Sequence, residues 1–248
     1  MVSLYEWYKS YEELYHEGPA ISEERLPLLL KLVDGLKFRN FLDVGCGDGS
    51  VTARFRERIG SEFTAGLEIS EDGVTRAKRH GILAQIANID ADEFPFADET
   101  FDFILCSELI EHLFDPDHLL DEIHRVTKSQ GLLLLTTPNV AAWYDRLSLL
   151  LGYQPVSIPV SLYFSEIGRL SGIKSLAGRE HIRFFTARGI RDSLVNHGFE
   201  PIRIVGWMRE PPPDAPFPFR QLARIVNVIC SLRPSLCTTT IMLCRKSR

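Results

Sequence analysis

A glycine-rich loop that follows an apolar segment constrains the fold of this chain more than any other feature. Residues 42–49 read Leu-Asp-Val-Gly-Cys-Gly-Asp-Gly, and a helical pattern follows at 51–59. A strand, a glycine turn and a helix in this order present backbone N–H groups and a helix N-terminus to a nucleotide-like ligand. We therefore expect an α/β sheet that holds such a ligand at one edge.

Strand and helix patterns alternate along most of the chain. The expected strands are 38–44, 62–68, 82–87, 101–107, 131–136, 200–207 and 237–245, and the expected helices are 49–60, 70–80, 115–127, 186–197 and 219–232. Ser70 and Thr186 are placed to cap two of these helices. Alternation of this kind predicts a Rossmann-like, mostly parallel sheet of seven strands with helices on both faces.

One long segment interrupts the alternation after the fifth strand. Residues 139–185 hold an amphipathic stretch, prolines and glycine-rich turns. A connection of this length inside a compact domain is usually functional. We therefore predict an inserted lid over the carboxyl edge of the sheet. The expected organisation is an N-terminal helical cap at 1–34, followed by one domain at 35–248 that contains the insertion.

Composition excludes several classes of protein. The chain has 248 residues, a net charge of −5 and five cysteines without a Cys-x-x-Cys pair. The acidic balance disfavours nucleic acid as a partner, and no apolar run approaches the roughly 18 residues of a membrane span. The aromatic, acidic beginning does not read as a signal peptide. Buried, reduced thiols in a cytoplasmic protein and no metal site are the expectations.

The spacing of the glycines decides which ligand the loop suits. A dinucleotide fingerprint requires a glycine where this chain has Ser50, whereas the third glycine comes one residue earlier, at Gly49. The loop is preceded by Asp43, and this arrangement resembles motif I of the class I S-adenosylmethionine (SAM) methyltransferases. A nicotinamide-dependent dehydrogenase is the disfavoured alternative.

Further motifs along the chain carry the same resemblance. An acid, Glu68, ends the second strand, and residues 90–96 (Asp-Ala-Asp-Glu-Phe-Pro-Phe) are similar to a segment of this family. Phe101-Asp102-Phe103-Ile104, Glu111-His112-Leu113 and Thr137-Pro138-Asn139 follow at the family's spacing. The resemblance covers about 35–245, and it is strongest toward ubiquinone-biosynthesis O-methyltransferases and the MetW-like proteins of methionine biosynthesis.

The resemblance implies SAM as the cofactor and S-adenosylhomocysteine as its product. It places the glycine loop around the methionine part of SAM, Glu68 on the ribose hydroxyls and Asp90 on the adenine amino group. Asp43 would orient the α-amino group, and Ile69 would pack on the adenine face. The complete set of expected cofactor-binding residues is Asp43, Gly45, Cys46, Gly47, Glu68, Ile69, Asp90, Ala91 and Ser107.

Three residues could assist the chemistry. A methyl group on a sulfonium is already activated, so transfer needs a nucleophile held in line, and a base where that nucleophile is a hydroxyl. Glu108 and His112 are four residues apart and would share one face of a short helix. His181 lies in a segment, Arg179 to Phe185, that lines the substrate side in relatives. Glu108, His112 and His181 are the candidate catalytic residues.

The sequence constrains the methyl acceptor less than it constrains the cofactor. The segment 139–191 holds seven basic and three acidic residues, which favours an anionic substrate. An apolar stripe in the same segment could contact a hydrophobic substrate or a partner, although such a stripe is more often core. The stripe consists of Trp143, Leu147, Leu150 and Leu151. The favoured function is methyl transfer to a small molecule, with oxygen as the expected acceptor atom, in a chain that could form a homodimer. The alternative is an accessory or regulatory protein of MetW-like type with little transferase activity.

Overall fold

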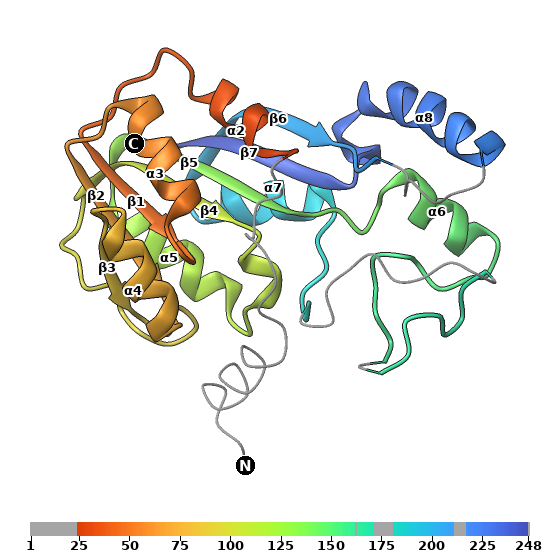
Figure 1. Cartoon of the computed structure of the whole chain (residues 1–248), viewed down its shortest axis with the longest axis horizontal. Coiled ribbons are helices and arrows are strands. Elements are labelled where there is room, and N and C mark those ends of the chain that lie inside the picture. The colour runs from red at the N-terminus through yellow and green to blue at the C-terminus, as the bar shows by residue number, and fades with distance from the viewer. Residues whose placement is uncertain (1–23, 162, 171–180, 211–216, 248) are drawn as a thin grey trace.

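A single sheet of seven strands forms the centre of the computed structural model, which describes residues 24–161, 163–170, 181–210 and 217–247 (Figure 1). The strand order is β3-β2-β1-β4-β5-β7-β6. The strands are β1 (Asn40–Val44), β2 (Phe63–Glu68), β3 (Leu83–Ile86), β4 (Phe101–Ser107), β5 (Thr127–Pro138), β6 (Phe199–Trp207) and β7 (Thr239–Lys246). Strands β1 to β5 pair in parallel and β7 runs antiparallel to both β5 and β6, so the predicted mostly parallel sheet is confirmed.

Helices cover both faces of this sheet. The helices on the sheet are α2 (Leu26–Leu32), α3 (Ser50–Ile59), α4 (Glu71–Arg79), α5 (Pro116–Val126) and α7 (Ala187–Asn196). Helices α6 (Trp143–Leu150) and α8 (Phe217–Ser231) lie beyond the end of the sheet, at the right of Figure 1, and the short 3₁₀ turns are η1 (Ile110–His112) and η2 (Pro234–Leu236). Helices α2 and α3 contribute to one buried cluster, and α5 and α7 contribute to another. Among the described residues, no helix is both long and apolar enough to cross a membrane.

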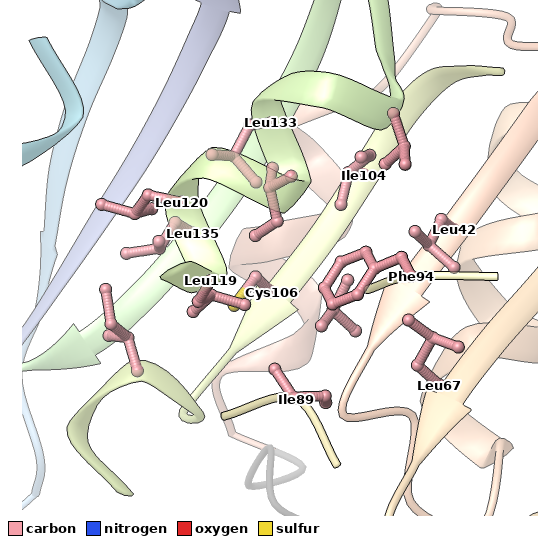
Figure 2. Close-up of a cluster of buried hydrophobic side chains, with 14 of the residues drawn as sticks. Leu42, Leu67, Ile89, Phe94, Ile104, Cys106, Leu119, Leu120, Leu133 and Leu135 are labelled. Carbon is pink, nitrogen blue, oxygen red and sulfur yellow. The ribbon is translucent and has the colours of Figure 1, made fainter. Parts of the chain in front are cut away.

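Neighbouring residues of the central strands belong to opposite faces. Phe41 and Phe103 pack in the cluster beneath α2 and α3, whereas Leu42 and Ile104 pack in the cluster beneath α5. Figure 2 shows the second cluster, in which side chains from β1, β2, β4 and β5 meet α5. Because side chains alternate along a strand, a strand that is covered on both faces must be apolar at every position. This requirement explains the continuous apolar runs in the sequence.

Local signals in the sequence place the helix starts. The Ser70 side chain accepts a hydrogen bond from the Gly73 amide at the start of α4, and Thr186 caps α7 by accepting from the Gly189 amide. Both caps are as predicted. Asp115 likewise accepts from the His118 amide and caps α5. Each cap satisfies an amide that has no partner within its helix.

The segment after β5 folds around two buried charged side chains. The Asp145 carboxylate on α6 accepts hydrogen bonds from the amides of Val156 and Ser157. Arg169 donates to the carbonyl groups of Pro155 and Ile158. These bonds hold an irregular stretch beneath α8 and α6 in the view of Figure 1. Its function as a lid stays a prediction, as does the N-terminal cap, of which the described residues include α2.

Candidate functional site

The glycine loop turns sharply at the carboxyl ends of β1 and β2. The amides of Gly45 and Cys46 both donate to the carbonyl oxygen of Leu67, at 2.8 and 3.0 Å. Gly45, Gly47 and Gly49 all have positive φ, a conformation that residues with a side chain rarely adopt. Helix α3 then starts at Ser50 without a side-chain cap. The first turn of α3 therefore presents amides that suit a polar or anionic ligand group.

Glu68 joins this loop to the end of β2. One carboxylate oxygen accepts from the Gly47 amide at 2.9 Å, and the other accepts from the amides of Ile69 and Ser70 at 2.8 and 3.1 Å. Gly73 of α4 packs closely against the Glu68 side chain, since a β-carbon at Gly73 would lie 3.0 Å from the Glu68 Cγ. These contacts fix the orientation of the carboxylate at the mouth of the loop.

A pocket opens beside Glu68. Five of its lining residues are predicted cofactor or catalytic residues, namely Gly45, Glu68, Ile69, Asp90 and His112. The other lining residues, which sequence reasoning did not assign, are Ala87, Asn88, Ile89, Leu109 and Leu113. Their signal was available, because they flank the motifs at 90–96 and 111–113. The pocket is lined by apolar side chains together with a few polar ones, as is usual for a ligand-binding cleft.

Asp90 also lines this pocket, and one of its carboxylate oxygens has no partner in the part of the chain that the structure describes. Its Oδ1 accepts from the amides of Phe114 and Asp115, at 2.8 and 3.0 Å. Its Oδ2 is buried and has no hydrogen-bond partner among the described residues. Burial also raises the pKa of Asp90. Because an unsatisfied buried acceptor is costly, this oxygen is suited to an amino group of a ligand. The neighbouring Ala91 is exposed and does not line the pocket.

Three other predicted cofactor residues are buried and are not among the residues that line the pocket. Asp43 is buried and accepts from the Thr52 hydroxyl at 2.5 Å, and burial raises the pKa of Asp43 to about 7. Cys46 packs among apolar residues of α4 and β3, with its thiol directed at Gly66. The Ser107 and Thr136 hydroxyls share a hydrogen bond. Direct contact of these side chains with a ligand stays a prediction.

Glu108 does not share a helical face with His112 as expected. The only helical residues near them are Ile110–His112, and Glu108 precedes this turn with a φ of 52°. Its carboxylate forms a 2.9 Å ion pair with Arg25 and accepts from the Thr136 hydroxyl at 2.9 Å. The left-handed backbone at Glu108 turns the carboxylate toward Arg25, which also lies 5.3 Å from the ring centre of Trp207. The Glu108 carboxylate is therefore engaged in a structural ion pair with Arg25, and its function as a catalytic base stays a prediction.

His112 and His181, two of the candidate catalytic residues, lie next to each other. Their rings meet edge to face with centroids 4.8 Å apart. The segment of His181 is fixed by the amides of Ile182 and Arg183, which both donate to the carbonyl oxygen of Glu111. The Glu111 carboxylate is buried and accepts from the Thr137 hydroxyl at 3.0 Å. Glu111 belongs to the Glu111-His112-Leu113 motif, but the sequence alone predicts no function for it.

Several basic side chains of the insertion make contacts within the protein, and the apolar stripe is mostly exposed, which the sequence alone did not reveal. Arg146, Arg169 and Arg183 donate to backbone carbonyl groups, and Arg191 pairs with the adjacent Asp192. Lys174 and Arg179 lie outside the described residues. The predicted stripe is largely exposed rather than core, since Leu147, Leu150 and Leu151 are exposed, while Trp143 donates to Asn227 of α8.

Comparison with known proteins agrees with this geometry. A family model described as "Methyltransferase domain" matches residues 15–204. The ubiquinone biosynthesis O-methyltransferase of Neisseria meningitidis serogroup C is 30% identical over 122 residues, which are 46% of this chain and 51% of that protein. The malonyl-[acyl-carrier protein] O-methyltransferase of Salmonella typhimurium is 29% identical over 123 residues, which are 50% and 48% of the two chains. The chain thus spans about half the length of these curated relatives.

Solved structures share the whole fold. A SAM-dependent methyltransferase from Archaeoglobus fulgidus superposes with a TM-score of 0.59 and 16% identity, over 97% of this chain and all of that one. At this identity the likeness concerns the fold alone. Together, the family match and the shared fold agree with a glycine loop at the carboxyl edge of the sheet, while the functions of individual residues stay predictions.

Proposed function

This chain belongs to the methyltransferase domain family, and from that premise we propose that it transfers the methyl group of SAM to an oxygen atom of a small-molecule acceptor. SAM is the cofactor, and S-adenosylhomocysteine is the product. The relatives described above are named for methyl transfer to oxygen, and that supports the choice of acceptor atom.

The observation that carries this proposal is that two acidic acceptors, Glu68 and Asp90, line one pocket together with apolar side chains. Glu68 is fixed by three amides with its carboxylate at the mouth of the glycine loop, where it can accept from both ribose hydroxyls. Asp90 offers a buried, unpartnered oxygen that can accept from the adenine amino group. Ile69 and Leu113 supply apolar surface between them. The donors of the adenosine part of SAM fit this arrangement of acceptors.

The transfer itself requires few protein groups. Bound SAM supplies a methyl group on a positively charged sulfur, so the chain must mainly hold the acceptor in line and exclude water. Leu109 packs against Gly45 at the loop and lines the pocket, so it can help to exclude water. A hydroxyl acceptor must also lose its proton, and His112 lies at the pocket wall with an imidazole that can assist that loss.

The test is an acceptor screen that follows the formation of S-adenosylhomocysteine. Phenols, catechols and carboxylic acids should give turnover with SAM, and amines of similar size should not. Dialysed protein should bind S-adenosylhomocysteine in calorimetry whichever acceptor is present. Turnover with amines alone would refute the choice of oxygen, and the absence of S-adenosylhomocysteine binding at millimolar concentration would refute the function as a whole.

A further inference from the structure

Three side chains beside the proposed cofactor pocket have the composition of a metal centre. One ligand atom each from Glu111, His112 and His181 lies within 4.8 Å of the other two. Glu111 and His112 are consecutive in η1, and His181 is held against them by the two backbone hydrogen bonds to the carbonyl oxygen of Glu111. Residues about seventy positions apart in sequence are thus brought to one point by ordered backbone.

A second observation points to a cation at this place. Glu111 is 1% exposed, and its Oε2 accepts from the Thr137 hydroxyl, but its Oε1 has no hydrogen-bond partner among the described residues. Leaving a buried carboxylate oxygen unpaired is costly. A cation between the carboxylate and the imidazoles would satisfy this oxygen.

We infer that Glu111, His112 and His181 bind a divalent transition-metal ion of the zinc type. Two imidazoles and one carboxylate suit zinc, cobalt or manganese better than magnesium or calcium, which prefer oxygen ligands. Three protein ligands leave at least one coordination position open. In tetrahedral coordination with bonds of about 2.0–2.1 Å, the ligand atoms lie roughly 3.3 Å apart, so side-chain movements of about 1 Å would close the site.

The open position suggests a function for the ion, and this part rests on the proposed function. His112 borders the cofactor pocket, so an ion on its imidazole would lie next to the place where methyl transfer occurs. A bound divalent ion lowers the pKa of an oxygen that it contacts and orients it. A hydroxyl of the acceptor would then lose its proton to solvent more readily. With the ion bound, His112 would act as a ligand, and solvent would take the proton in place of the His112 imidazole considered under the proposed function.

The surroundings of the site fit this assignment. Thr137 donates to Glu111 and fixes the carboxylate, as neighbours of metal ligands commonly do. Glu108, three residues before Glu111, is neutralised by its ion pair with Arg25. The nearest acid is therefore not an uncompensated charge that competes for the ion. The expectation of no metal site rested on the spacing of histidines and cysteines, which does not reveal ligands brought together by folding.

The experiment measures metal binding directly. Chelator-treated full-length protein is titrated with Co²⁺, Zn²⁺ and Mg²⁺, with calorimetry for affinity and the visible absorption of Co²⁺ for ligand type. The variants Glu111→Gln and His181→Ala test the site, and near-ultraviolet circular dichroism checks their folding. His197→Ala is the matched control, because His197 lies 3.4 Å from Asp117 on the surface and could bind metal adventitiously.

We expect one Co²⁺ or Zn²⁺ per chain, with weaker binding of Mg²⁺. Each site variant should weaken Co²⁺ binding by at least about tenfold, and His197→Ala should leave it unchanged. Equal affinity in all variants, or the largest loss in His197→Ala, would overturn the inference. Binding of S-adenosylhomocysteine is measured in parallel: if it is retained while no Co²⁺ binds, the metal site is refuted and the proposed function stands. Site-dependent Co²⁺ binding without S-adenosylhomocysteine binding supports the site and refutes the proposed function.

Discussion

Adding one methyl group at two glycines of the loop should separate folding from ligand binding. At Gly49 a β-carbon would lie 2.8 Å from the Cα of Ala77 and 2.7 Å from the Ile82 side chain, so α4 would have to move. At Gly47 a β-carbon would meet nothing within 4 Å. Both residues have positive φ, so both alanine variants carry the same kind of backbone strain.

The magnitudes follow from these distances. The left-handed backbone costs an alanine about 1–2 kcal/mol, and overpacking against a fixed backbone adds about 1–3 kcal/mol. Gly49→Ala should therefore lower the free energy of unfolding by about 2–5 kcal/mol, and Gly47→Ala by about 1–2 kcal/mol. Urea denaturation without ligand measures both values, provided that the slopes against urea agree.

Ligand binding should show the opposite order. The Gly47 amide donates to Glu68, which lines the pocket, so under the proposed function a methyl group on Gly47 would occupy space that the cofactor needs. Calorimetry with S-adenosylhomocysteine should show a larger loss of affinity for Gly47→Ala than for folded Gly49→Ala. If Gly49→Ala is as stable as Gly47→Ala, or if Gly47→Ala binds normally, this account of the loop is refuted.

Three further predictions concern charged residues around the site. Burial raises the pKa of Asp43 to about 7, so the native state keeps a proton there that the unfolded chain releases near pH 4. The free energy of unfolding should therefore fall by roughly 4 kcal/mol as the pH rises from about 4 to about 7. Asp43→Asn should flatten this dependence of stability on pH, and an unchanged dependence would contradict the burial of Asp43. Glu68→Gln should weaken S-adenosylhomocysteine binding by about 1–3 kcal/mol in calorimetry, and full affinity would show that the carboxylate does not contact the ligand. Arg25→Met should lower the free energy of unfolding by about 3–5 kcal/mol in urea denaturation, because it removes the ion-pair partner of Glu108. Adding Glu108→Gln to Arg25→Met should restore much of this stability. If the effects of the two substitutions on the free energy of unfolding simply add, the coupling is disproved.

The sheet and its cofactor edge were accessible from the sequence because their signals are local. Strand β1, the loop at 45–49 and the acid Glu68 follow one another in the chain, so spacing alone brings them together. Helix caps such as Ser70 are also local. The structure places these elements where the pattern predicts, with bounds that differ by a few residues.

The acceptor side was less accessible because its contacts join distant segments. Arg25 reaches Glu108 across the sheet edge, and His181 reaches Glu111 from the far end of the insertion. The helix expected to bring Glu108 and His112 together is reduced to one 3₁₀ turn, since Glu108 takes a left-handed conformation. Periodicity cannot predict such a backbone change. Periodicity likewise does not show what covers a helix, so the sequence left open whether the stripe at Leu147, Leu150 and Leu151 is core or a contact surface; these residues are exposed.

Calorimetric titration of the chain with S-adenosylhomocysteine, with NAD as the comparison ligand, tests the central claim most directly. The account predicts saturable binding of one S-adenosylhomocysteine per chain and no binding of NAD at the same concentration, because the loop lacks the third glycine of a dinucleotide site at Ser50. Saturable binding of NAD, with no heat from S-adenosylhomocysteine at millimolar concentration, would contradict it.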